Sequence, residues 1–250
     1  MLRPYSGLYI GSAGIHSRAE RRKRRETVNI DNIQKLLEFD TPTVANGVGL
    51  LGVRDPATGY TGPDVRALMP EMGVRVGVAV TARMDTTSPG TDDPPSLFKD
   101  WLRLIREAAK GGMPVFALIE AVGPRPRYTV SLGDGMATLM RLAGAVGFLT
   151  DGGMRDLEGV REVGLPCWAV GLSPMHGQLR WLDLNSTVMI DGMTVRPGDV
   201  IHADVNGAVV IPHEVADQVY DKAVAVRKKE QGLFAQWRAP GMTLDAYLNE

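Results

Sequence analysis

Runs of apolar and polar positions divide the middle of the chain into alternating strands and helices. Residues 73–84 are rich in β-branched side chains, which is typical of a strand. Residues 96–110 carry apolar side chains at helical spacing and stop at Gly111, a common helix terminator. Residues 113–121 form a second apolar run. The pattern therefore predicts a strand, a helix and a buried strand in succession.

The same alternation continues through the next stretch, where the turns are short. A helix is predicted from Gly133 to Leu142 and a second one over residues 157–163, each followed by a short strand, at 147–150 and 166–170. Strands that alternate with helices in this way favour an α/β fold with a parallel or mixed sheet flanked by helices.

The segments before residue 73 and after residue 170 do not show this alternation of strands and helices. Short strands joined by turn signals are predicted at 188–190, 193–195, 200–203 and 208–211, and a final helix at 213–231. Before the first strand, residues 31–39 predict a short amphipathic helix with Asp31 as its N-cap. Thr41-Pro42-Thr43 is expected to break that pattern, and residues 43–52 to begin a strand–turn–helix unit.

Charge and composition narrow the class of protein. The 250 residues have a net charge of −1, with 44% hydrophobic and 23% charged residues, so no global field favours nucleic acid or an anionic membrane. Cys167 is the single cysteine, which excludes an intrachain disulfide. The sequence contains no apolar run of membrane-spanning length and no recognisable secretory signal, so we expect a cytoplasmic protein.

Three segments are expected along the chain. Residues 1–26 form a basic N-terminal extension with an arginine-rich run, interpreted as a solvated arm more readily than as a nucleic-acid-binding arm. Residues 27–232 are expected to form the main domain, and residues 233–250 a C-terminal tail.

The stretch around Gly133-Asp134-Gly135 is the first candidate for chemistry. A helix that begins between glycines exposes free backbone N–H groups, which bind carboxylate or phosphate well. A plain turn with Asp134 as N-cap would give the same sequence, so this signal is weak when it stands alone.

The loop from Asp151 to Asp156 is the second candidate. It follows a short buried strand, and ligands gather at the carboxyl ends of strands in α/β sheets. Carboxylates with water suit Mg²⁺ or Mn²⁺, and Arg155 can bind a substrate carboxylate or enolate oxygen. A local salt bridge between Arg155 and Asp156 is the structural alternative.

The sequence motifs of other common metal, nucleotide and nucleophile sites are absent. The histidines show no metal-ligand spacing and are interpreted as surface or loop residues: His16, His176, His202 and His213. Cys167 lies in an apolar strand and is interpreted as a core residue. No Walker A loop, dinucleotide-binding glycine loop or GxSxG elbow is present.

Two motifs resemble those of the RraA-like family, which includes class II 4-hydroxy-4-methyl-2-oxoglutarate/4-carboxy-4-hydroxy-2-oxoadipate aldolases and regulators of ribonuclease E activity. They are GDGMATLMRLAGAVGFLTDGGMRD at 133–156 and VRPGDVIHADVNGAVVIP at 195–212, and TPTVANGV at 41–48 is similar to an upstream family segment. The resemblance implies an α-β-β-α sandwich similar to a phosphohistidine swivelling domain. It also implies a trimer or a dimer of trimers with active sites between subunits.

The resemblance also implies roles for individual residues. Asp156 would hold a divalent cation, Mg²⁺ or Mn²⁺, directly or through its waters. Arg155 would bind the 2-oxo acid and its enolate, and Asp134 would position water for proton transfer. Gly133, Gly135 and Met136 would form the substrate-binding turn, with the N–H groups of the last two holding the pyruvyl carboxylate.

The function so implied is a metal-dependent lyase that releases pyruvate from a 2-oxo acid. The reaction would be aldol cleavage, decarboxylation of oxaloacetate, or both. A non-catalytic regulator of a ribonuclease is the first alternative, although that branch typically lacks the aspartate found here at Asp156. Another lyase on the same scaffold is the second alternative, because Gly135 and Asn46 depart from the family pattern. The acidic residue that the aldolases take from a neighbouring subunit has no secure counterpart in this sequence.

Overall fold

The eight-stranded main sheet is the centre of the fold. This computed structural model describes residues 28–90 and 96–248, so the predicted extension at 1–26 lies outside the described residues. The sheet runs in the order β1 (Arg66–Ala67), β7 (Cys167–Ala169), β5 (Ala145–Thr150), β3 (Val115–Ala121), β2 (Arg75–Asp85), β12 (Val200–Asp204) and β13 (Gly207–Ile211), and β9 (Arg180–Leu184) pairs with the end of β2. The strands β2, β3, β5 and β7 are parallel and the others antiparallel, which confirms a mixed sheet.

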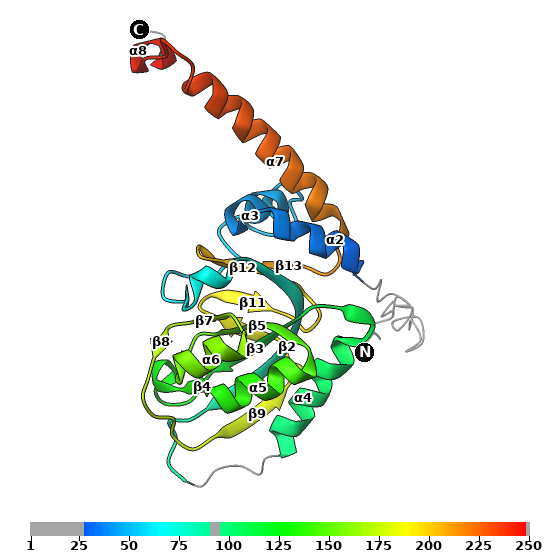
Figure 1. Ribbon diagram of the computed structural model, residues 1–250, viewed down its shortest axis with the longest axis vertical. Coiled ribbons are helices and arrows are strands. Elements are labelled where there is room, and N and C mark those ends of the chain that lie inside the picture. The colour runs from blue at the N-terminus through cyan, green and yellow to red at the C-terminus, as the bar shows by residue number, and fades with distance from the viewer. Residues whose placement is uncertain (1–27, 91–95, 249–250) are drawn as a thin grey trace, which may run out of the picture.

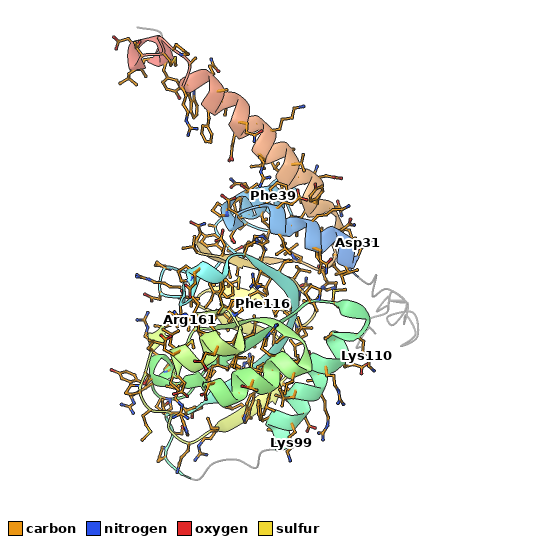
Figure 2. The ribbon with its side chains drawn as sticks, in the orientation of Figure 1. Asp31, Phe39, Lys99, Lys110, Phe116 and Arg161 are labelled. Carbon is orange, nitrogen blue, oxygen red and sulfur yellow. The ribbon has the colours of Figure 1, made fainter. Side chains whose placement is uncertain are left out.

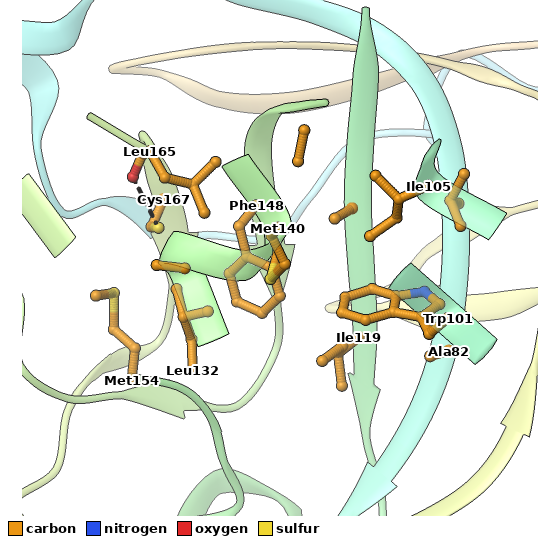
Figure 3. Packing of buried hydrophobic residues seen from close by; sticks show 14 of the residues in the cluster. Ala82, Trp101, Ile105, Ile119, Leu132, Met140, Phe148, Met154, Leu165 and Cys167 are labelled. Atoms are coloured by element: carbon orange, nitrogen blue, oxygen red, sulfur yellow. Dashed lines mark hydrogen bonds between the residues drawn. The ribbon is translucent and has the colours of Figure 1, made fainter. Parts of the chain in front are cut away.

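Three helices cover one face of this sheet: α4 (Ser96–Ala108), α5 (Asp134–Ala143) and α6 (Leu157–Val163) (Figure 1). Between them and the strands lies a cluster of fully buried side chains that includes Trp101, Met140 and Phe148 (Figure 3). Lys99 in the first turn of α4 and Lys110 just beyond its last residue are both exposed on the outer side (Figure 2). Burial of large apolar side chains contributes about 1.5–3 kcal/mol each, so this cluster is a major source of stability.

The main sheet curves strongly, so its other face is nearly enclosed. Strands β12 and β13 and the hairpin β10 (Val188–Ile190)–β11 (Met193–Val195) surround a second buried cluster that includes Phe116, Trp168 and Ile201. Outside β12 and β13 lie α2 (Ile30–Gln34), η1 (Lys35–Glu38), α3 (Thr41–Gly49) and α7 (Ala216–Trp237), which pack on a third cluster. The predicted α/β class is confirmed, with a barrel-like sheet between helices, and the likeness to a swivelling domain stays a prediction.

A second, small sheet stands beside the main one. Its strands β4 (Val130–Leu132), β6 (Gly153–Met154) and β8 (Gly171–Leu172) are all parallel. Short 3-10 turns complete the described elements: η2 (Pro70–Met72), η3 (Lys110–Gly112) and η4 (Pro126–Tyr128).

The predictions before the first strand were wrong in two respects. The first helix begins at Ile30, because Asn29 is its N-cap and accepts the Asp31 N–H at 2.9 Å. The segment that was expected to begin as a strand is the helix α3, with Pro42 in its first turn. Proline is tolerated there because the first N–H groups of a helix have no intrahelical acceptor. Asp40 caps this helix by accepting the Thr43 N–H at 3.0 Å.

The C-terminal helix is longer than predicted. α7 continues to Trp237, so the expected boundary between residues 232 and 233 falls inside it, and α8 (Leu244–Leu248) follows. The far half of α7 leads away from the sheets and carries α8 at its tip (Figure 1). None of the helices in the described part of the chain is both long and apolar enough to cross a membrane.

Candidate active site

The small sheet brings three loops to one place. Its parallel strands end at the same edge, so the residues that follow β4, β6 and β8 are neighbours. The ladder continues past the strands, because the Arg155 N–H donates to the Leu132 carbonyl and the Ser173 N–H to the Met154 carbonyl, both at 2.9 Å. The carboxyl edge of parallel strands is where α/β proteins gather ligand-binding residues.

Gly133 is the N-cap of α5 and is closely covered by two charged side chains. A Cβ atom on Gly133 would lie 2.8 Å from Oδ2 of Asp156 and 3.2 Å from Nε of Arg155. A larger residue at this position would require at least one of the two side chains to shift. Glycine at this position therefore allows a guanidinium and a carboxylate to reach the start of α5, where the helix dipole and free N–H groups favour an anion.

Asp156 has an unusual backbone. It caps α6 in the left-handed region, with φ 57° and ψ 43°, and it is one of the few non-glycine residues with positive φ among those described. Its side chain pairs with Arg155, Nε to Oδ2 at 3.2 Å, and both side chains remain about one-third exposed. Such backbone strain is often found at functional sites. The predicted salt bridge is therefore present, and both members of the pair remain accessible to a ligand.

Asp134 occupies the first turn of α5 and is exposed. Its Oδ1 accepts the N–H of Gly135 at 2.7 Å, and its side chain lies against Gly159 of α6, where a Cβ atom would be 2.8 Å from Oδ2. Asp134 therefore occupies one of the two N–H groups expected to hold a substrate carboxylate. A substrate that binds there must displace this carboxylate or use the Met136 N–H.

These residues surround a cavity of about 250 Å³. It is lined by Val130, Leu132, Gly133, Asp134, Gly135, Met136, Arg155, His176 and Leu179. The structure thus brings Arg155 together with the residues predicted around Gly133-Asp134-Gly135. Asp156 is the exception, since it does not line the cavity but contacts Arg155 beside it.

His176 is the cavity residue that sequence reasoning missed. Its interpretation as a surface or loop histidine is confirmed, because it belongs to the loop after β8, but this loop histidine also lines the cavity. The signal that could have found it is its position just after the third strand of the small sheet, and a two-residue strand has no periodicity to recognise. Its imidazole adds a hydrogen-bonding group to the wall of the cavity.

Asp151, the other carboxylate of the predicted metal loop, is not part of this cavity. It lies at the end of β5 and accepts the Ala121 N–H at 2.8 Å. Burial raises the pKa of Asp151 to about 6, with a smaller contribution from the negative charge of Glu120. Asp151 therefore binds the backbone at the end of β3 and lies outside the cavity.

His202 and Cys167 are core residues, so the interpretation of His202 as a surface or loop histidine was wrong. His202 is buried between the Thr41 hydroxyl, 3.0 Å from Nδ1, and the Leu36 carbonyl, 3.1 Å from Nε2. Burial lowers the pKa of His202, so it stays neutral in the core. Cys167 is buried as predicted, and burial raises the pKa of its thiol.

One other group could hold a metal. It consists of Asp199, His213 and Glu214. Within the described residues, no other three histidine, cysteine or acidic side chains have their ligand atoms close enough together to hold one metal ion. Arg196 binds both carboxylates, at 3.0 Å to Asp199 and 2.7 Å to Glu214, and the contact lowers the pKa of Glu214 to about 2. Because a guanidinium already neutralises these carboxylates, we interpret the group as a structural ion cluster. It shares no residue with the cavity.

Comparison with known proteins decides the family. A family model described as RraA-like, Aldolase/RraA, matches residues 41–210. The chain belongs to the RraA-like family. The match includes every residue of the candidate site, so the motifs at 133–156 and 195–212 were identified correctly.

Two relatives illustrate how distant the similarity is. An uncharacterized protein of Methanocaldococcus jannaschii is 31% identical over 136 residues, which cover 54% of this chain and 64% of the relative. A Halalkalibacterium halodurans protein named "Putative 4-hydroxy-4-methyl-2-oxoglutarate aldolase" is 29% identical over 153 residues, which cover 60% of this chain and 69% of the relative. The matched region thus spans 64% of the first relative and 69% of the second, so it covers only part of the length of each.

Solved structures share the fold. Streptomyces coelicolor RraAS2, described as an unusual member of the RNase ES inhibitor RraA family, is 25% identical with a TM-score of 0.66, covering 84% of this chain and 99% of that one. A protein from Pseudomonas syringae has a TM-score of 0.67 at 21% identity, covering 89% and 95% of the two chains, and supports the fold alone.

Proposed function

We propose that the protein is a divalent-metal-dependent lyase that cleaves a carbon–carbon bond in a 2-oxo acid and releases pyruvate. The observation that carries the proposal is the approach of Arg155 and Asp156 to Gly133 at the start of α5. This approach supports the proposal because a guanidinium that lines the cavity, a carboxylate that contacts this guanidinium and a helix N-terminus lie close together. Relatives named as aldolases of 4-hydroxy-4-methyl-2-oxoglutarate support the same reaction class.

The carboxylate of the substrate would bind at the first turn of α5. The N–H of Met136 points from that turn, and the N–H of Gly135 becomes available once Asp134 moves away from it. Backbone donors at a helix N-terminus hold a carboxylate without a full countercharge. This orientation would direct the 2-oxo oxygen toward Arg155 and Asp156.

The chemistry of the donors fits a hard divalent cation. Asp156 offers an exposed carboxylate, and Mg²⁺ is commonly bound by one or two carboxylates with several waters retained. The donors present thus fit a water-rich site centred on Asp156. Bound there, the cation would supply Lewis-acid stabilisation of the substrate's oxygen atoms.

Arg155 would stabilise the charge that develops during the reaction, and Asp134 would position a water for proton transfer. When the carbon–carbon bond breaks, negative charge develops on the enolate oxygen, and Arg155 is placed to donate hydrogen bonds to it. Asp134 borders the same cavity and would position the water that exchanges a proton with the enolate carbon or the leaving group. His176 lines the same cavity and is a candidate to assist that exchange. No Schiff-base lysine is required.

A pyruvate-release assay tests the proposal. The purified chain is incubated with oxaloacetate and with 4-hydroxy-4-methyl-2-oxoglutarate, each with Mg²⁺, with Mn²⁺ and after chelation. We expect metal-dependent release from at least one substrate. Folded protein that releases no pyruvate from either would favour the alternatives, a ribonuclease regulator or another lyase. Release that is insensitive to chelation would refute the metal.

A further inference from the structure

The order of the strands in the small sheet sets the order of groups along the cavity. β6 lies between β4 and β8, so the loop that carries Arg155 separates the start of α5 from the loop that carries His176. Neighbouring strands are about 4.8 Å apart, which puts the two outer loops roughly 10 Å from each other. Residues of all three loops line the cavity. A ligand that is held at the start of α5 and passes Arg155 therefore meets His176 next.

The imidazole of His176 is oriented by a hydrogen bond within its own loop. Its Nδ1 bonds to the Gly177 carbonyl oxygen, and because a carbonyl oxygen can only accept, Nδ1 carries the proton. A neutral imidazole with its proton on Nδ1 has an acceptor lone pair on Nε2. Among the described residues, none donates a hydrogen bond to Nε2. The ring therefore brings an available acceptor to the wall of the cavity.

The loop around His176 is held in place by the loop that follows β2. Gly177 passes so close to that loop that a Cβ atom on it would lie 1.7 Å from the Thr86 carbonyl oxygen. Arg180 donates to the Pro89 carbonyl at 2.7 Å. Because both contacts lie within a few residues of His176, its ring keeps its place before a substrate arrives, which is the condition for efficient catalysis by a positioned group.

Aldol cleavage of a 4-hydroxy-2-oxo acid needs a base for the hydroxyl proton. Three ionisable side chains line the cavity, those of Asp134, Arg155 and His176. Arg155 has no acceptor atom. Asp134 lies at the start of α5, where the substrate carboxylate is proposed to bind, and its Oδ1 already accepts the Gly135 N–H. His176 is thus the acceptor on the far side of Arg155, where the C4 hydroxyl group would reach.

We propose that His176 is the catalytic base that takes the proton of the C4 hydroxyl group, and that it makes the site selective for 4-hydroxy-2-oxo acids. This inference rests on the proposed function. Nε2 takes the hydroxyl proton, and the electron pair of the O–H bond forms the carbonyl group of the departing oxo acid. The C3–C4 bond breaks, and its electron pair forms the enolate of pyruvate, whose oxygen Arg155 stabilises.

The same proton then completes the reaction. The water positioned by Asp134 carries it from the imidazolium of His176 to C3 of the enolate, which yields pyruvate and restores the neutral ring. No oxidant or further reactant is needed. Oxaloacetate has a carboxylate at C4 that leaves as carbon dioxide, so its decarboxylation has no hydroxyl proton to remove. The two reactions therefore share Arg155 but differ in their need for His176.

A comparison of two substrates tests this role in the full chain. Pyruvate release from 4-hydroxy-4-methyl-2-oxoglutarate and from oxaloacetate is measured for the unaltered protein, His176→Ala and Met175→Ala. The ratio of aldol cleavage to decarboxylation should fall about 100-fold or more in His176→Ala, the usual effect of losing a general base. It should stay unchanged in Met175→Ala, because Met175 is 72% exposed and outside the cavity. An unchanged ratio in His176→Ala, or decarboxylation without aldol cleavage in the unaltered protein, would overturn the inference.

Added imidazole separates a base from a structural role. It should restore part of the aldol cleavage in His176→Ala, because free imidazole fits the space that the ring leaves, and should not change Met175→Ala. His176→Gln can accept a hydrogen bond but cannot take the proton, so it should stay slow. Melting temperatures of all variants show whether the fold is intact. Absence of rescue by imidazole would overturn the role of His176 as a base.

Binding after chelation of the metal separates this inference from the proposed reaction. 4-Hydroxy-4-methyl-2-oxoglutarate and 4-methyl-2-oxoglutarate, which lacks the hydroxyl group, are titrated by calorimetry. The unaltered protein should bind the hydroxy compound about 3–10-fold more tightly, the effect of one hydrogen bond, and His176→Ala should bind both equally. This preference without pyruvate release would mean that the proposed reaction fails while recognition by His176 stands. Equal affinities in the unaltered protein, or no binding, would overturn the recognition even if pyruvate is released.

Discussion

Gly133 and Asp156 approach so closely that a methyl group on Gly133 would lie 2.8 Å from Oδ2 of the carboxylate. The contact joins the start of α5 to the cap of α6, and Arg155 lies over the same glycine. Substitution of this one residue therefore changes the site without touching a charged group.

The first prediction follows from this contact. Gly133→Ala should push Asp156 and Arg155 away from the start of α5 and lower turnover by about 100-fold or more, because preorganised charge would be displaced. Gly232→Ala is the control, since a Cβ atom on Gly232 meets nothing within 4 Å. Turnover and melting temperature are measured on both variants. Full activity in folded Gly133→Ala would show that the close contact has no catalytic importance.

The second prediction separates catalysis from a structural salt bridge. Asp156→Asn keeps the shape but removes the charge, so it should abolish metal-dependent turnover. Arg155→Lys keeps the charge but loses the planar guanidinium, and should cost about 10²–10³ in turnover. Excess Mg²⁺ should partly rescue weak metal-site variants but not Arg155→Ala. A purely structural pair would lower the melting temperature and leave turnover of the folded fraction unchanged.

The third prediction concerns Asp151 and pH. Its folded pKa, about 6, lies above the ordinary value of 3.8, so the folded state binds the proton more tightly. This contribution to stability is present at low pH and is lost as pH rises from about 4 to 6. Asp151→Asn should remove that loss, worth at most about 3 kcal/mol, and leave turnover unchanged. Chemical denaturation of both proteins at pH 4.5 and 7.5 measures it. Identical pH profiles would contradict the raised pKa.

The fourth prediction concerns the ion cluster around Asp199, which is only 3% exposed. Asp199 binds Arg196 and also accepts the His213 N–H at 3.1 Å. Removing it by Asp199→Ala should cost about 3 kcal/mol and lower the melting temperature by roughly 6–12 °C. The exposed partner Glu214→Gln should cost about 1 kcal/mol or less. If a chelator lowered the melting temperature of the unaltered protein as much as Asp199→Ala does, the cluster would be a metal site instead.

The fifth prediction concerns the basic extension. Deleting residues 1–26 should leave turnover within a few-fold of the full chain, since a solvated arm contributes nothing to the cavity. The deleted protein is compared with the full chain for turnover and particle mass. Loss of activity with an intact oligomer would mean that the arm completes the site of a neighbouring copy.

The sequence predicted those elements whose signals are local. Strands 188–190 and 193–195 coincide with β10 and β11, because the Asp191-Gly192 turn fixes the hairpin, and the helix at 157–163 coincides with α6. α3 was missed because Pro42 was interpreted as a breaker, although its position just after the Asp40 cap is where a helix accepts proline.

The site was predictable in part for the same reason. Gly133, Asp134 and Arg155 lie in one continuous motif, and one α–β unit brings them together. His176 comes from a third loop, and only the pairing of β6 with β8 places it beside them. The sequence did not show which of the two aspartates, Asp151 or Asp156, would lie beside the cavity. The direction in which each side chain points depends on the turn between β5 and β6.

The three loops that follow the strands of the small parallel sheet carry different kinds of residue. Those after β4 and β6 carry the charged groups, and the loop after β8 adds His176 and Leu179 as a separate wall. That wall can vary in length and sequence while the charged groups keep their places, because each loop is anchored to its own strand. Under the proposed function, exchange of residues 173–179 between relatives should therefore transfer substrate selectivity while Arg155 and Asp156 keep their positions, so that this loop is where new specificities would evolve.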